Sequence, residues 1–215
     1  MSLTKFLNAI GKEVQEKEAV KDEVYKAMRE AIRTSKQAIF STHKRKFEEA
    51  KKLLRRAKWL FAKLDEVPLD HRDIVYGGLV DAAYQEFTEA YVFLKLALGE
   101  GFVGPKKIKV PSISYLLGLA DVVGELRRLT LDSLRKGDLK LAENCLETME
   151  VIYDGIMSMD EALHVVGELR RKSDMARRII EATRGDVTVE ARKHSLERSI
   201  EKLEKIARKR TKMKT

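Results

Sequence analysis

The stretch Gln85-Glu86-Phe87-Thr88-Glu89-Ala90 lies inside a mainly apolar run from Ile74 to Leu98, which is typical of a core helix. Helical spacing places Glu86 and Glu89, three residues apart, on one side of that helix. At about 100° per residue, the residues nearest to Glu86 on the helix surface are apolar: Leu79, Ala82, Ala83, Ala90 and Phe93. A carboxylate on an apolar face is costly unless it is paired. The pattern therefore predicts that Glu86 shares a cation with other carboxylates.

A second helical segment offers the other carboxylates. Asp121 and Glu125 are four residues apart and so one turn apart. The helical projection puts them on a narrow stripe of small and polar residues, made of Ser114, Gly118, Asp121, Glu125, Arg128 and Asp132. The small residues near Asp121 predict room for a ligand. Two such acidic faces brought together would form a four-carboxylate pocket, which suits Mg²⁺ or Mn²⁺.

A simpler interpretation of these acids stays open. The chain has 34 Asp and Glu residues, so carboxylates three or four apart also occur by chance, mostly on solvated faces with salt bridges. In this alternative, Glu86 and Glu89 pair with Arg or Lys across a contact between subunits. The apolar surroundings expected for Glu86 favour the metal site.

The composition is that of a highly charged globular protein. The chain has 215 residues and a net charge of +9, which favours an anionic partner, nucleic acid rather than a membrane surface. Its single cysteine, Cys145, excludes an intrachain disulfide and a cysteine-rich zinc site. No pattern of a signal peptide or of a membrane span is present, which predicts a soluble cytoplasmic protein.

Basic residues occur in short clusters. One of them lies on an expected helix and contains Lys51, Lys52, Arg55 and Arg56. Any one cluster is typical of a solvated face, but together with the net charge they favour a nucleic acid. We expect these four residues to guide a nucleic acid strand, and we expect Arg128, on the face of Glu125, to contact phosphate.

Hydrophobic periodicity predicts an all-α protein of antiparallel helices. Helices are expected over residues 3–42, 44–64, 71–98, 112–136, 139–157 and 160–208, with a break in the last near Gly185-Asp186. Asp70 and Ser112 are the expected N-caps of the third and fourth helices. Residues 1–207 are expected to form one helical domain, and residues 208–215 a basic flexible tail.

Two sequence features invite misreading. The stretch Gly99 to Gly104 matches GxGxxG by letter, but it follows a helix instead of a strand, so it is interpreted as a helix end and a loop. The heptapeptide Val122 to Arg128 recurs as Val165 to Arg171, with His164 in the place of Asp121. Because the flanking residues do not match, the sequence does not indicate a repeat protein.

The two acidic segments resemble a known family. Gln85-Glu86-Phe87-Thr88-Glu89-Ala90 resembles the Q-E-[YF]-x-E-A segment of Trax-like members of the translin superfamily, and Tyr115 to Arg128 resembles their Y-L-x-G-x-A-D-x-x-G-E-L-x-R segment. Ser35 to Phe40, followed by His43, looks like the family's first-helix pattern. The similarity extends from about Val20 to Arg208, and the short chain resembles an archaeal type.

This resemblance implies a fold and an activity. The family fold is a bundle of about seven antiparallel helices, and its subunits form closed hollow barrels, often octamers, that enclose RNA. Trax subunits are Mg²⁺-dependent endoribonucleases, whereas translin binds nucleic acid. The matching metal ligands and catalytic residues here are Glu86, Glu89, Asp121 and Glu125, and all four are present.

The sequence therefore predicts a Mg²⁺- or Mn²⁺-dependent endoribonuclease. Its expected substrate is single-stranded or short RNA, with single-stranded DNA as a further ligand. The chain is expected to form a homo-oligomer, with the octamer as the family's common size. The alternative is a non-catalytic, translin-type oligomer that binds RNA or DNA and in which the four acids are structural.

Overall fold

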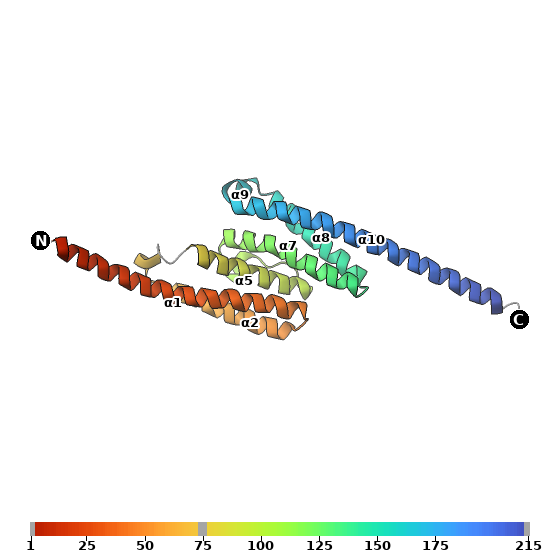
Figure 1. Cartoon of the computed structure of the whole chain (residues 1–215), viewed down its shortest axis with the longest axis horizontal. Coiled ribbons are helices and arrows are strands. Elements are labelled where there is room, and N and C mark those ends of the chain that lie inside the picture. The colour runs from red at the N-terminus through yellow and green to blue at the C-terminus, as the bar shows by residue number, and fades with distance from the viewer. Residues whose placement is uncertain (1–2, 73–76, 213–215) are drawn as a thin grey trace. The chain divides into compact units, whose positions relative to one another are not determined.

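The structure, a computed structural model (Figure 1), describes residues 3–72 and 77–212. The described residues form helices and connecting turns, without a strand, which confirms the predicted all-α class. None of the helices within these residues has the length and apolarity needed to cross a membrane. The chain divides into two compact units, Met1–Val122 and Val123–Thr215.

Unit 1 is built around three long helices. Helix α1 (Leu3–His43) packs along α2 (Phe47–Leu60) and α5 (Gly78–Ala97), and these segments lie side by side in Figure 1. From Val24 onward α1 buries a residue every three or four positions, as an amphipathic helix does. Short elements connect the long ones: α3 (Ala62–Asp65), the 3₁₀ helix η1 (Leu69–His71) and α6 (Pro105–Ile108).

The core of unit 1 is centred on α5. Phe87 and Phe93 have no exposed surface, and burial of each ring stabilises the fold by about 1.5–3 kcal/mol. The Phe61 ring lies 5.3 Å from that of Phe87 and stacks on Tyr84 at 4.5 Å, measured between ring centroids. These contacts fix the rotation of α5, and with it the direction in which Glu86 and Glu89 leave the helix.

Helix α7 (Ser112–Arg135) starts in unit 1 and ends in unit 2. Its first turn is attached to the preceding loop, because the Tyr115 hydroxyl donates a hydrogen bond of 2.7 Å to the carbonyl of Val103. The same loop contains Gly99 and Gly101, both at positive φ, directly after α5. The GxGxxG letters thus lie in a helix end and a loop, as predicted.

Unit 2 contains the rest of α7 with α8 (Leu139–Met157), α9 (Asp160–Val165) and α10 (Gly167–Lys212). The bounds of α8 match the prediction, because the Asp138 carboxylate caps the helix by accepting a 3.1 Å hydrogen bond from the Leu141 amide. Helix α8 packs on α10, and its buried residues recur every three or four positions: Ala142, Cys145, Met149, Ile152 and Ile156.

Four predicted boundaries are wrong. The helix expected over residues 44–64 is two helices, because α2 begins at Phe47 and ends at Leu60, and α3 follows it. Helix α5 begins at Gly78, and its N-cap is Gly77 rather than Asp70, which lies in η1; residues 73–76, which the predicted helix included, lie outside the described residues. The loop before α7 contains the short helix α6. The last helical region is interrupted at Val166 and continues through Gly185.

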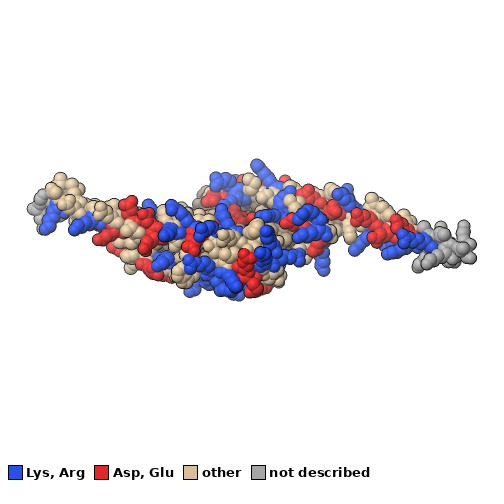
Figure 2. All heavy atoms as spheres, turned by 60° about the horizontal axis from the view of Figure 1, so that its bottom comes forward, with Lys and Arg blue, Asp and Glu red and all other residues tan. Residues whose placement is uncertain are grey.

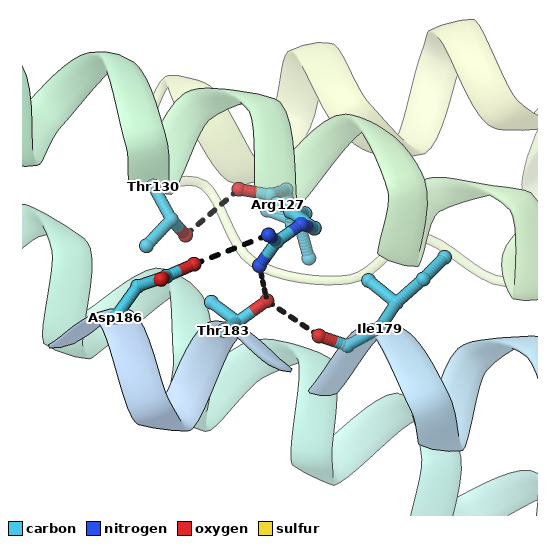
Figure 3. A network of polar contacts seen from close by, with 6 residues as sticks. Arg127, Thr130, Ile179, Thr183 and Asp186 are labelled. Atoms are coloured by element: carbon cyan, nitrogen blue, oxygen red, sulfur yellow. Dashed lines mark hydrogen bonds and ion pairs between the residues drawn. The ribbon is translucent and has the colours of Figure 1, made fainter. Parts of the chain in front are cut away.

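A polar contact explains why α10 continues through Gly185. In unit 2 the Arg127 guanidinium donates hydrogen bonds to the Thr183 hydroxyl at 2.7 Å and to the Asp186 carboxylate at 3.1 Å (Figure 3). Thr183 in turn donates to the Ile179 carbonyl at 2.6 Å. Because Arg127 of α7 holds α10 on both sides of Gly185, this single glycine does not end the helix.

Cys145 should be unreactive in the folded protein. Its side chain is buried in unit 2, and burial raises the pKa of the thiol to about 11. We expect no labelling by a maleimide at pH 8 until urea unfolds the chain. Because the folded pKa lies above the unfolded value, this thiol should also lower the free energy of unfolding as the pH rises from about 8.5 toward 11. Fast labelling in native buffer would contradict this account.

Candidate functional site

Helices α5 and α7 touch at Gly118. A Cβ atom added to this glycine would lie 2.5 Å from the Gln85 carbonyl oxygen and 2.8 Å from the Thr88 Cβ atom. Real Cβ atoms do not approach other atoms so closely, and the first of these neighbours is backbone. The prediction that the small residues of the α7 stripe leave room for a ligand is therefore wrong at Gly118, because the α5 backbone occupies that space.

This contact sets the position of three of the four predicted carboxylates. Gln85 and Thr88, which touch Gly118, are the sequence neighbours of Glu86 and Glu89 on α5. Asp121 follows Gly118 by three residues on α7. All three acids belong to unit 1, and all three are partly exposed. Glu125, also partly exposed, lies one turn after Asp121 on the same helix.

Glu86 has a partner that the sequence pattern did not show. Its Oε1 atom lies 3.1 Å from the Nζ atom of Lys36 on α1, and 25% of its side chain is exposed. The surroundings expected for Glu86 were apolar, with a metal ion or a basic residue of another subunit as its partner. In the structure a lysine of the same chain lies beside it, because α1 packs along α5. The sequence contained a hint of this partner, because Lys36 lies in the stretch Ser35 to Phe40 that resembles the family's first-helix pattern.

The described residues contain no group of three or more acidic, histidine or cysteine side chains arranged to hold a metal ion. In this arrangement Glu86 faces Lys36, and Glu89, Asp121 and Glu125 each interact with other groups. The four acids nevertheless have the oxygen ligands that Mg²⁺ prefers. The donor chemistry of the four acids thus fits a metal ion, but Glu86 would have to turn away from Lys36 to reach one.

The predicted basic residues differ in their surroundings. On α2, Lys51 pairs with Glu48 at 2.8 Å. Arg56 pairs with Glu30 of α1 at 2.9 Å, and its guanidinium carbon lies 4.4 Å from the centre of the Trp59 ring. Arg56 thus attaches α2 to α1, which is a structural role. The remaining members of the predicted set are exposed: Lys52, Arg55 and Arg128.

Figure 2 shows the side of the molecule on which α1 and α2 come forward, where basic side chains gather with acidic ones among them. The net charge of +9 is thus not confined to one basic stripe on this face. Such a surface attracts a polyanion over a distance, while the individual contacts depend on how each cation is paired with nearby carboxylates.

Comparison with known proteins identifies the family. Residues 19–208 match the model of the Translin family, and the chain belongs to this family. An uncharacterised protein of Methanocaldococcus jannaschii is 32% identical over 183 residues, which are 84% of this chain and 81% of the relative. The translin-associated protein X of Pongo abelii is 35% identical over 52 residues, 24% of this chain and 18% of that protein.

Comparison with solved structures supports the same family fold. The AfC3PO–duplex RNA complex matches with a TM-score of 0.76 and 36% identity, over 86% of this chain and 96% of that chain. Apo-NeC3PO has the same TM-score of 0.76 at 22% identity, over 88% of this chain and 100% of that chain, and this second match supports the fold alone. The predicted translin-type helical fold is therefore confirmed.

Proposed function

We propose that this chain forms a translin-type oligomer that binds RNA and cleaves it with the help of Mg²⁺. The observation that carries the proposal is the close contact of α5 and α7 at Gly118, which brings the segments of Glu86, Glu89 and Asp121 together in unit 1. The similarity to the AfC3PO–duplex RNA complex, at 36% identity, supports RNA as the ligand.

The acids would act as a set. Glu86, Glu89 and Asp121 of unit 1 would hold the metal ion, and the resemblance of the Tyr115 to Arg128 segment to the family adds Glu125 to the set. When bound, the ion activates a water molecule and stabilises the charge on the phosphate. One of the carboxylates accepts the proton of the attacking water. Glu86 must leave Lys36 to take part, and because that ion pair is partly exposed, breaking it costs only about 0–1 kcal/mol.

Lys36 offers a control for Glu86. Glu86→Gln and Lys36→Gln both remove the 3.1 Å ion pair, but only the first removes the carboxylate. Both should change the free energy of unfolding by no more than about 1 kcal/mol. Cleavage of labelled RNA should be lost in Glu86→Gln and kept in Lys36→Gln. An equal loss in both variants would assign the pair, instead of the carboxylate, to function.

Exposed apolar residues support assembly. Among the described residues, the first turns of α1 expose a stripe at helical spacing, Leu3, Leu7, Ile10 and Val14, and the last part of α10 exposes Leu196, Ile200, Leu203 and Ile206. Large exposed apolar patches usually mark contacts with other chains. We therefore propose a homo-oligomer, in which neighbouring subunits cover these stripes.

A non-catalytic RNA-binding oligomer is the second candidate. It is favoured by the Lys36–Glu86 ion pair, because a carboxylate paired within the chain can be structural. In that protein the acids would only hold helices together. The two candidates share RNA binding and differ in whether Mg²⁺ leads to cleavage.

The deciding experiment is incubation of the purified protein with end-labelled RNA, single-stranded and duplex, in Mg²⁺ and in EDTA. We expect internal cleavage in Mg²⁺ and intact, bound RNA in EDTA. Binding without cleavage under both conditions would favour the non-catalytic oligomer, and no binding under either would contradict both. Light scattering of the same sample should report a species larger than a dimer.

A further inference from the structure

A cleft in unit 1 lies between α2 and α5, away from the Gly118 contact. It has a volume of about 290 Å³, and Leu54 and Leu94, which are almost fully buried, form its apolar floor. Four basic side chains surround this floor: Lys51, Arg55, Lys58 and Lys95. The cleft thus combines an apolar surface with a positive rim.

Acidic residues neutralise this rim only in part. Lys51 pairs with Glu48, and Lys95 pairs with Glu100. These hydrogen bonds to lysine lower the pKa of both carboxyl groups, so both acids are ionised at neutral pH. Arg55 and Lys58 form neither an ion pair nor a side-chain hydrogen bond with any part of the chain that the structure describes.

Tyr91 gives the cleft an aromatic wall. Its ring lies 5.7 Å from that of Phe87, which has no exposed surface, so the ring is supported from the core. The Nζ atom of Lys95 lies 5.9 Å from the centre of the Tyr91 ring. Lys95 thus lies over the Tyr91 ring, so a nucleobase at this wall would meet an aromatic side chain together with a cation. A phosphate attached to that base would meet the other cations of the rim.

We propose that this cleft binds one nucleotide, with the base against Tyr91 and the leucine floor and the phosphate at Arg55 and Lys58. The volume is near the lower end of the range of small-molecule sites, which fits a single nucleotide better than a strand. The nucleotide is either free or the phosphorylated end of an RNA. The inference deepens the proposed function by adding a nucleotide site outside the carboxylate set, and it rests on that function only for the RNA end.

The test is calorimetric titration of the full-length protein in EDTA, so that no cleavage occurs, with adenosine monophosphate, inorganic phosphate and adenosine. We expect adenosine monophosphate to bind more tightly than either fragment. Arg55→Gln and Lys58→Gln should each weaken its binding roughly tenfold, the loss of one charged contact. Tyr91→Leu should weaken it while leaving the weak binding of inorganic phosphate unchanged.

The matched control is Lys106→Gln, which removes an exposed lysine of α6 that does not line the cleft. The proposal would be overturned if the wild type did not bind adenosine monophosphate, or if the cleft variants bound it as tightly as the wild type and the control do. It would also be overturned if inorganic phosphate bound as tightly as the nucleotide.

Competition by 5′-phosphorylated RNA but not by 5′-hydroxyl RNA would assign the site to an RNA end. A lack of competition would assign it to a free nucleotide. Asp121→Asn, which removes a proposed metal ligand, should still bind adenosine monophosphate. A failure of the cleavage proposal can therefore be distinguished from a failure of the nucleotide site.

Discussion

Replacing Gly118 with alanine is expected to lower the free energy of unfolding by roughly 1–3 kcal/mol, the usual cost of inserting a methyl group into a packed contact. The new Cβ atom would lie 2.5 Å from the backbone oxygen of Gln85, which cannot turn away as a side chain can. Helix α7 must therefore shift from α5. Because small displacements of catalytic groups reduce rates strongly, we expect Mg²⁺-dependent cleavage to fall by about 100-fold.

Urea unfolding and single-turnover cleavage measure the two effects. Gly124→Ala on the same helix is the matched control, because a Cβ added there has no atom within 4 Å apart from its chain neighbours and the backbone of its own helix. That variant should cleave normally and should be as stable as the wild type, or about 0.5–1 kcal/mol more stable, since alanine favours helix. If Gly118→Ala were as stable and active as the wild type, the observation that carries the proposed function would be lost.

Removing the charge of a proposed metal ligand should abolish cleavage and spare RNA binding. Asp121→Asn and Glu89→Gln keep the shape of the side chain, so a loss of at least about 100-fold in the cleavage rate would report on the carboxylate itself. RNA binding should persist, because the basic side chains stay in place. A gel-based cleavage assay and a filter-binding assay measure the two properties.

A readout independent of activity is the stabilisation by Mg²⁺. At ten times its dissociation constant, Mg²⁺ should add about 1.4 kcal/mol to the free energy of unfolding of the wild type, and none to that of Asp121→Asn. Asp81→Asn, which changes an exposed acid in the first turn of α5, should behave as the wild type in both assays. Full cleavage by all variants of the four acids would show that they are structural.

The parts of the fold that local sequence determines were predictable. The bounds of α8 follow from the Asp138 cap and from apolar spacing, which both depend on residues close together in the chain. The pairing of Glu86 with Lys36 depends on how α1 packs on α5, which periodicity along one helix does not show. The continuation of α10 through Gly185 depends on Arg127, which is distant in the sequence.

The heptapeptide that occurs twice takes two conformations. Val122 to Arg128 lies within α7, whereas in the second copy Val165 ends α9, Val166 lies at the break and Gly167 begins α10. Val122 has no exposed surface, but 76% of Val165 is exposed. The two copies begin 43 residues apart, at Val122 and Val165. A sequence alignment that relies on these seven residues alone can therefore match the wrong copy and place Glu168 at the position of Glu125. The residue before the heptapeptide is Asp121 in the first copy and His164 in the second. When relatives are aligned, this residue shows which copy carries the proposed metal ligands.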